Sequence, residues 1–382
     1  MVIALSDPKE FSIYLHIPFC KKKCDYCHFY VIPDKEQHKH LLLDALMLEW
    51  DLLLQKLPKN NQLKSIYFGG GTPSLFGPER VKAVLDKIRK SFKEDVEVTL
   101  EVNPEDVTYE LISEYMNVGI NRISMGVQSL DDGELQLLTR RHDAKKALYA
   151  VEEIVRAGIS NLSIDLMYDL PHQTNTSWEK TITTASSLPI THLSLYNLTI
   201  EPHTVFHKYK NQLTKHLPSE TSSFQMYTRA TNLLEKAGLR QYEVSAFAKD
   251  GCYSRHNTGY WTGRPFLGLG PSAYSFWKGN RYRNVANINR YAQQLQKGLI
   301  PVETVDGLPD EDRKKELLVV ALRLIDGINL EYFEELHGPL PSSTNKSLND
   351  LIDNQLLVLD NGHLKLTKRG ILLYDSIATE LI

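Results

Sequence analysis

Apolar, β-branched segments alternate with amphipathic segments through about the first 200 residues, with a repeat of roughly 30 residues. Pro78 suits the first turn of a helix, and Gly158 suits a left-handed cap at the end of another. Consecutive βα units build a parallel sheet that curves into a barrel or part of one. The predicted fold class is therefore α/β, with a partial, TIM-like (β/α)6 barrel. The alternation predicts strands at residues 11–17, 63–69, 96–102, 122–128, 161–168 and 192–198, and helices at residues 36–56, 78–91, 108–118, 143–157 and 174–187.

The pattern changes after about residue 200, so we divide the chain into three units. They are a barrel at residues 1–220, an extension at 221–300 and a small α+β domain, winged-helix-like, at 301–382. Asn-Gly between two short apolar runs near the C-terminus is a strong hairpin signal. The predicted elements are a loop at 203–222, a helix at 222–237, a strand at 241–247, a dense stretch rich in Gly, Tyr, Trp and Asn at 255–283, helices at 311–325 and 344–354, and strands at 356–359 and 364–366.

Composition and charge disfavour several classes of protein. The 382 residues carry a net charge of −3, which does not provide the broad basic surface typical of nucleic-acid binding. Four cysteines, three of them clustered, do not suit a disulfide framework, and no apolar run approaches the ~20 residues of a membrane helix. Residues 1–10 lack the basic-then-apolar pattern of a signal peptide. These features predict a cytoplasmic protein without a nucleic-acid partner or a membrane span.

Cys20, Cys24 and Cys27 form a C-x3-C-x2-C motif behind the first predicted strand. Three closely spaced thiolates can hold three corners of an iron–sulfur cube and leave the fourth iron open to a small molecule. A zinc site with His16 or His28 as fourth ligand stays an alternative, as do free thiols, although there is no second C-x2-C pair. Residues 24–28 also match C-x-x-C-H, the attachment pattern of c-type haem, which normally requires an exported chain. The spacing favours the iron–sulfur cluster.

Unusual polar residues recur where the predicted strands end. In βα barrels the carboxyl ends of the strands form one rim, and this rim carries the chemistry. The glycine run at 69–71 lacks the spacing of a dinucleotide site or a P-loop, but it allows close approach of a ligand, and its exposed amides are expected to receive a carboxylate. An amino-acid-bearing nucleoside, whose ammonium and carboxylate chelate the open iron, would suit this rim. The rim residues are Gly69, Gly70, Gly71, Thr72, Pro73, Glu101, Asn103, Gln128, Arg140, Asp165, Tyr196 and Asn197.

With these motifs in view, the chain resembles the radical S-adenosylmethionine proteins over most of its length. The resemblance implies a [4Fe–4S] cluster on the three cysteines. Asp169 departs from the family's usual glycine, which bears on the geometry of the loop beside the site. The matching segments are Tyr14–Cys20, Gly69–Pro73, Glu101–Pro104, Ser124–Ser129 and Asp165–Pro171. The S-adenosylmethionine contacts that the resemblance implies are Tyr14, Gly70, Gly71, Thr72, Glu101, Gln128, Arg140 and Asp165.

Within this family the chain is most similar to the oxygen-independent coproporphyrinogen III oxidases and to the haem chaperones. The oxidases have a fourth cysteine two residues after the third and a long segment before the cysteines, whereas this chain has Phe29 at that position and Cys20 near its start. Residues 256–261 match the H-N-x-x-Y-W signature of the chaperones. Taken alone, this segment suggests a packed aromatic turn. With the resemblance, and because imidazole is a common axial ligand, the candidates for haem contact are His256, Asn257, Tyr260 and Trp261.

The resemblance therefore implies a haem chaperone that binds haem and delivers it to apo haem proteins, including respiratory cytochromes and clients at the membrane periphery. The cluster and S-adenosylmethionine would then support assembly, homodimer formation or redox control. The alternative is an enzyme that decarboxylates the propionates of coproporphyrinogen III through a 5′-deoxyadenosyl radical and forms protoporphyrinogen IX. We expect the chain to lack this oxidase activity.

Overall fold

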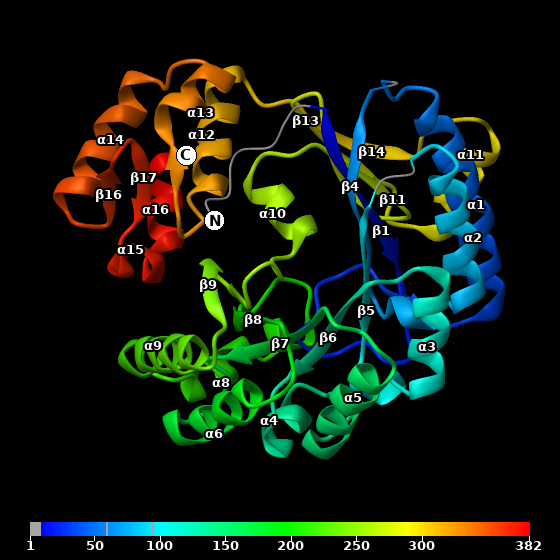
Figure 1. The fold of residues 1–382 in the computed structure, drawn as a ribbon, viewed down its shortest axis with the longest axis horizontal. Helices are drawn as coiled ribbons and strands as arrows, with labels where there is room; N and C mark the ends of the chain where they lie inside the picture. Colours follow the sequence, from blue (N-terminus) through cyan, green and yellow to red (C-terminus); the bar gives the residue numbers. More distant parts are fainter. Residues whose placement is uncertain (1–8, 59, 93–94) are drawn as a thin grey trace.

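A sheet of twelve strands forms the centre of the computed structural model, which describes residues 9–58, 60–92 and 95–382 (Figure 1). Their order is β14-β13-β12-β11-β1-β4-β5-β6-β7-β8-β10-β9. From β11 to β8 every neighbouring pair is parallel, and the outer strands pair antiparallel. β8 pairs with β10 rather than with β11, so the curved sheet stays open. The α/β class and the partial barrel are confirmed.

The predicted elements of the barrel form close to their predicted bounds. Pro78 opens α2, and Gly158 follows α5 with a φ of +102°, as expected. The helices lie outside the sheet in Figure 1. The strands are β1 (Glu10–Ile17), β4 (Gln62–Gly70), β5 (Glu97–Val102), β6 (Arg122–Gln128), β7 (Leu162–Tyr168) and β8 (His192–Asn197). The helices are α1 (Glu36–Leu54), α2 (Pro78–Arg89), α3 (Tyr109–Val118), α4 (Asp132–Leu137), α5 (Ala144–Arg156) and α6 (Asn175–Ser186).

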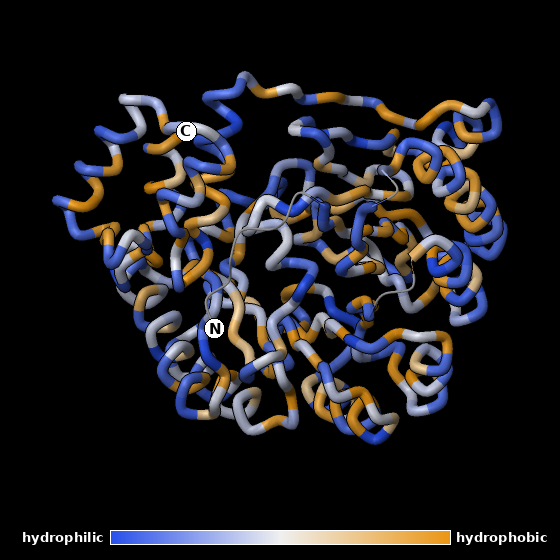
Figure 2. Tube along the Cα trace, turned by 45° about the horizontal axis from the view of Figure 1, so that its top comes forward, coloured by the Kyte–Doolittle hydropathy of each residue, from blue (hydrophilic) through white to orange (hydrophobic). Residues whose placement is uncertain are grey.

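Apolar side chains from the strands and the surrounding helices form the main core. Ile13, Ile66, Ile123 and Ile164, from β1, β4, β6 and β7, are buried in one cluster with Leu46 of α1. In Figure 2, hydrophobic and hydrophilic residues alternate along the outer helices, as expected for helices with one face on a sheet. Burial of these side chains fixes the register of the strands, and register brings the strand ends to a common rim.

Three predictions beyond residue 200 are wrong in detail. The expected loop at 203–222 contains short helices, the expected strand at 241–247 is a pair of antiparallel strands, and the aromatic turn expected at 255–261 is a helix, α10. The Glu97 carboxylate on β5 accepts hydrogen bonds from the first amides of α10 at 3.0 Å, and this distant partner is not visible in the local sequence. The elements are α7 (Val205–Lys208), α8 (Lys210–Leu213), α9 (Glu220–Lys236), β9 (Arg240–Glu243), β10 (Ala246–Ala248), α10 (Arg255–Trp261), β11 (Phe266–Leu269), β12 (Tyr274–Trp277), β13 (Asn280–Asn284), α11 (Ile288–Gln296) and β14 (Val302–Asp306).

The C-terminal domain has a core of its own. Leu318, Phe333 and Leu357 belong to this second cluster of buried side chains. Asn361 and Gly362 adopt φ values of +49° and +78°, so the predicted Asn-Gly hairpin is confirmed. The elements are α12 (Asp310–Ala321), β15 (Ile328–Asn329), α13 (Leu330–His337), α14 (Ser342–Asp353), β16 (Leu357–Asp360), β17 (His363–Leu366), α15 (Lys368–Leu372) and α16 (Tyr374–Leu381).

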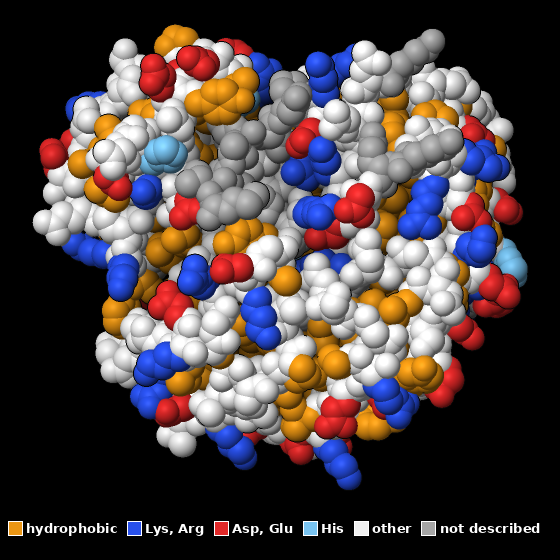
Figure 3. All heavy atoms as spheres, in the orientation of Figure 1, with side chains coloured by type: hydrophobic (Ala, Val, Ile, Leu, Met, Phe, Trp, Pro, Cys, Tyr) orange, Lys and Arg blue, Asp and Glu red, His pale blue; other side chains and the backbone are white. Residues whose placement is uncertain are grey.

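The surface is chemically mixed. Basic and acidic side chains are interspersed on the face seen in Figure 3. No helix in the described part of the chain has both the length and the hydropathy of a membrane span.

Candidate metal and cofactor site

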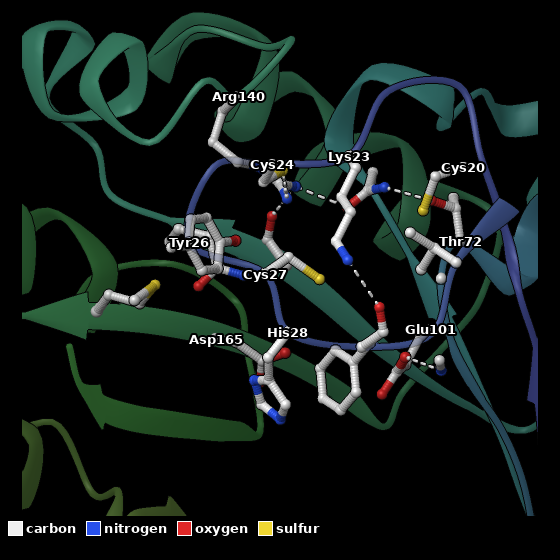
Figure 4. Close-up of a pocket in the computed structure, with 18 of the residues that line it drawn as sticks. Cys20, Lys23, Cys24, Tyr26, Cys27, His28, Thr72, Glu101, Arg140 and Asp165 are labelled. Atoms are coloured by element: carbon white, nitrogen blue, oxygen red, sulfur yellow. Dashed lines mark hydrogen bonds between the residues drawn. The ribbon is translucent and has the colours of Figure 1, made fainter. Parts of the chain in front are cut away.

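The three cysteines lie on a loop that is closed at its base by two short strands. β2 (Phe19–Cys20) pairs in parallel with β3 (Ile32–Pro33). Within the loop, the amide of Cys27 donates to the carbonyl of Cys24 at 3.1 Å, which turns the chain back on itself. All three cysteines line one cavity of about 440 Å³, and Figure 4 shows their sulfurs facing a shared space. This arrangement suits a cluster held at three corners.

Polar groups around the sulfurs suit thiolates that bind a metal centre. Arg140 Nη1 donates to Cys24 Sγ at 3.6 Å, and Thr72 Oγ1 lies 3.7 Å from Cys20 Sγ. Burial raises the pKa of Cys20 to about 11, so a positive centre is needed to keep this sulfur ionised. No three His, Cys, Asp or Glu side chains among the described residues are arranged to share one metal ion, whereas a cubane offers each cysteine its own iron. The donor set therefore fits a [4Fe–4S] cluster more readily than zinc.

His16, one of the alternative zinc ligands, is occupied within the fold. Its Nε2 lies 2.8 Å from the carbonyl oxygen of Tyr30, and its Nδ1 lies 3.1 Å from the hydroxyl of Tyr14. Burial lowers the pKa of His16 to about 4, so the ring is neutral. A Cβ on Gly70 would meet this ring at 2.7 Å, so the glycine leaves room for the imidazole. Neither ring nitrogen is therefore free to ligate a metal ion.

The glycine run serves the packing of two strands. The backbone amides of residues 70–72 donate to the Glu101 carboxylate and to carbonyls of the segment that leads into the cysteine loop, at 2.7 to 3.1 Å. The expectation that these amides receive a ligand carboxylate is therefore wrong. A Cβ on Gly71 would lie 2.7 Å from the Phe19 carbonyl oxygen and 3.1 Å from Cys20 Sγ. Glycine at this position lets the end of β4 lie directly against the first cysteine.

Two buried carboxyl groups line the same cavity. Glu101 on β5 accepts a hydrogen bond from the Tyr67 hydroxyl at 2.8 Å, and burial raises the pKa of Glu101 to about 7. Burial also raises the pKa of Asp165 on β7 to about 6, against the opposing effect of hydrogen bonds from Ser194 and Ser124. Both groups lose their protons near neutral pH. The cavity then becomes more negative and can attract a cationic ligand.

The cavity contains seven of the eight expected S-adenosylmethionine contacts. Tyr14 is the exception, because its hydroxyl is directed to His16 and its side chain does not line the cavity. The seven are Gly70, Gly71, Thr72, Glu101, Gln128, Arg140 and Asp165. The sequence did not single out Tyr26, Glu105, Arg141, Met167 and Glu201, which also line the cavity. Most of these lie on loops, where no strand or helix period marks the inward-facing side chain.

The haem candidates lie elsewhere, on α10. His256 Nδ1 is 2.9 Å from Ser65 Oγ, and its Nε2 is 2.8 Å from the Tyr260 hydroxyl. The residue is 1% exposed, and burial lowers its pKa to about 3. The Trp261 ring faces the Arg323 guanidinium of the C-terminal domain at 4.4 Å. None of the four candidates lines the cavity, so in this structure the signature packs α10 into the barrel, as a helix rather than as the expected turn.

Comparison with known proteins agrees with this geometry. Residues 14–185 match the Radical SAM superfamily, and residues 308–373 match the HemN C-terminal domain. Heme chaperone HemW of Bacillus subtilis is 32% identical over 96% of this chain and 97% of its own length, and that of Haemophilus influenzae is 34% identical over 96% of each. The chain belongs to the haem chaperone HemW family of radical SAM proteins.

The relatives of this HemW-family chain extend to eukaryotes. Radical S-adenosyl methionine domain-containing protein 1, mitochondrial, of Danio rerio is 33% identical over 98% of this chain and 87% of its own length. Among solved structures, coproporphyrinogen III oxidase HemN of Escherichia coli has a TM-score of 0.82 at 23% identity and covers 97% of this chain and 89% of its own. The likeness to HemN concerns the fold alone. The resemblance to radical SAM proteins and haem chaperones is thus confirmed.

Proposed function

We propose that this HemW-family protein is a haem chaperone that binds haem, passes it to apo haem proteins and also holds a [4Fe–4S] cluster and S-adenosylmethionine. One observation carries the proposal. Three cysteines and seven expected cofactor contacts share one cavity, in a chain that matches HemW proteins over nearly its whole length. Haem as the cargo comes from the names of these relatives.

Each group in the cavity has a role that its chemistry suggests. Cys20, Cys24 and Cys27 would hold the cluster, which supplies an open iron and an exchangeable electron when bound. Arg140 compensates part of the negative charge of the thiolates through its contact with Cys24 Sγ. The carboxyl groups of Glu101 and Asp165 would meet the cationic and hydroxyl-bearing parts of S-adenosylmethionine.

Oxidation of coproporphyrinogen III is the second candidate, and its support is the shared fold with HemN. Phe29, which is 49% exposed at the mouth of the cavity, stands where the oxidases are expected to have a fourth cysteine. We therefore expect no protoporphyrinogen from coproporphyrinogen when the reduced, cluster-loaded protein is incubated with S-adenosylmethionine.

An anaerobic haem titration tests the proposal. The cluster-loaded full chain should give a saturable change in the Soret band at micromolar haem and should then transfer haem to apomyoglobin, which serves as a model acceptor. The triple variant Cys20→Ser, Cys24→Ser, Cys27→Ser should lose the broad iron–sulfur absorbance near 400 nm. Absence of any Soret change in the wild-type protein, or accumulation of protoporphyrinogen from coproporphyrinogen, would contradict the proposal.

Several finer expectations stay predictions. These are the cytoplasmic location, the homodimer, clients among respiratory cytochromes and peripheral membrane proteins, and domain boundaries near residues 220 and 300. Size-exclusion chromatography with and without haem measures the oligomeric state directly.

A further inference from the structure

Haem needs a place outside the cavity that the cluster and the nucleoside would share. That place does not coincide with α10 as it stands, because both nitrogens of His256 are hydrogen bonded within the barrel. The His256 ring lies beside Ser65, which itself bonds Ser12 in the first half of β1. His256 does not line the cavity, but its ring packs 4.8 Å from the Tyr67 ring, and Tyr67 donates its hydroxyl to the cavity residue Glu101.

An aromatic pair lies at the mouth of the cavity, directly after the third cysteine. His28 and Phe29 are both exposed and both line the opening. Their rings stack with centroids 4.6 Å apart and planes at 30°, which restrains the orientation of the imidazole. Within the described residues, no side-chain hydrogen bond engages His28. Its ring nitrogens are therefore free to bind a ligand.

Basic side chains accompany this pair. Lys22 and Lys23 are exposed and line the same opening, as does Arg141. Lys23 Nζ donates to the carbonyl oxygen of Phe29 at 3.1 Å, which holds a positive charge beside the aromatic rings. Lys22 forms no ion pair with any residue that the structure describes. Haem has a flat apolar ring, an iron that accepts imidazole and two carboxylates, and this opening offers a partner for each.

We propose that haem binds at this opening with His28 as an axial ligand, Phe29 against the porphyrin and Lys22 and Lys23 at the propionates. The inference rests on the proposed function, which supplies haem as the cargo, and it assigns the site. One imidazole nitrogen gives its lone pair to the haem iron, no electron is transferred, and no bond to a cysteine forms. The C-x-x-C-H pattern at residues 24–28 then contributes its histidine to haem, while its cysteines remain with the cluster.

Matched variants test this site in the cluster-loaded full chain. Anaerobic haem titrations, followed by Soret absorbance and by electron paramagnetic resonance of ferric haem, are compared among the wild type, His28→Ala, His256→Asn and His40→Ala. His40 is an exposed histidine on α1 and serves as the control. His28→Ala should lose the imidazole-ligated signature and at least about tenfold in affinity, and free imidazole should restore the spectrum. The other two variants should bind like the wild type.

Further measurements separate a ligand from a structural effect. The double variant Lys22→Glu, Lys23→Glu should weaken haem binding about tenfold or more without changing the ligand signature. Iron and sulfide analysis confirms that each variant keeps its cluster. An unchanged signature in His28→Ala, its loss in His256→Asn, or haem that resists acid–acetone extraction through thioether bonds would overturn this site while leaving haem binding intact. Failure of the wild type to bind haem would instead refute the proposed function and the site with it.

Discussion

The Glu101 carboxyl should make the binding of S-adenosylmethionine depend on pH. Burial raises the pKa of this group to about 7, and its oxygens accept hydrogen bonds from the Tyr67 hydroxyl and the Gly70 amide. Because a carboxyl with a raised pKa is neutral below that value and charged above it, the cavity offers this negative charge only above about pH 7. The ligand carries a sulfonium cation, so its affinity should rise with pH through that value.

The structure allows the size of this effect to be estimated. At pH 6 roughly a tenth of the Glu101 carboxyls are ionised, and at pH 8 roughly nine tenths are, so the wild-type affinity should rise by up to about tenfold between them. Glu101→Gln keeps the shape but never ionises. A contact with a charged group is worth about 1.5–3 kcal/mol, so this variant should bind roughly tenfold to a hundredfold more weakly than the wild type at pH 8. At pH 6, where only about a tenth of the wild-type carboxyls are ionised, the difference should shrink to about twofold to tenfold.

Anaerobic isothermal titration calorimetry of the cluster-loaded protein at pH 6, 7 and 8 measures this profile. Glu105→Gln is the matched control. Glu105 lines the same cavity, but its pKa is lowered. Burial acts to raise this pKa, and the hydrogen bond with His142 at 3.2 Å outweighs burial, so Glu105 stays ionised at all three pH values. Any loss in that variant should be equal at all three pH values. A flat wild-type profile, or Glu101→Gln with normal affinity at pH 8, would refute the reasoning.

Three further predictions concern the fold around the site. Burial raises the pKa of Glu49 from a usual 4.5 to about 7, so the free energy of unfolding of the wild type should fall by up to about 3 kcal/mol as the pH rises through this interval. Urea denaturation at pH 5 and 7.5 should show a smaller change for Glu49→Gln. Arg323→Met removes the guanidinium that lies 3.1 Å from the buried Glu243 carboxylate and should lower the free energy of unfolding by about 3 kcal/mol, measured by thermal denaturation. The double variant Arg323→Met, Glu243→Gln should regain most of this loss. Gly71→Ala places a Cβ 2.7 Å from a backbone oxygen of the cysteine segment and should reduce the iron bound per chain, whereas Gly133→Ala, which meets only a side-chain oxygen at 3.1 Å, should not.

The barrel could be predicted from the sequence because local pattern and tertiary partners agree there. Ile13 and Ile66 stand in apolar strand segments and meet in the same core, and Gly158 ends its helix as its position suggests. The α10 segment differs. Ser254 caps it locally by accepting from the Asn257 amide, but the amides of Arg255 and His256 donate to Glu97, which stands 158 residues before Arg255 in the chain. No local pattern contains that information, so the segment resembled a turn.

At the site, too, the sequence predicts which residues lie near one another better than it predicts where their side chains and amides point. Parallel strands bring their carboxyl ends together, so the sequence could predict that Glu101 and Asp165 share a rim with the cysteines. It could not predict where side chains and amides point. The Tyr14 hydroxyl is hydrogen bonded to His16, and the amides of residues 70–72 donate to neighbouring groups of the protein. Both outcomes depend on which strand lies alongside, and strand neighbours are a tertiary property.

The surroundings of α10 provide a way to distinguish two locations for haem. The His256 ring packs 4.8 Å from the Tyr67 ring, and Tyr67 donates its hydroxyl to Glu101. A haem that took one nitrogen of His256 as its ligand would replace the hydrogen bond on that nitrogen, worth about 1 kcal/mol, and would displace the ring that supports Tyr67. The pH profile of S-adenosylmethionine binding should then shift away from a midpoint of about 7. Haem bound by His28 leaves Tyr67 in place, so the midpoint of the pH profile for S-adenosylmethionine binding should be the same with and without haem. A midpoint that shifts with haem in the wild type but not in His256→Asn would place haem at α10 instead.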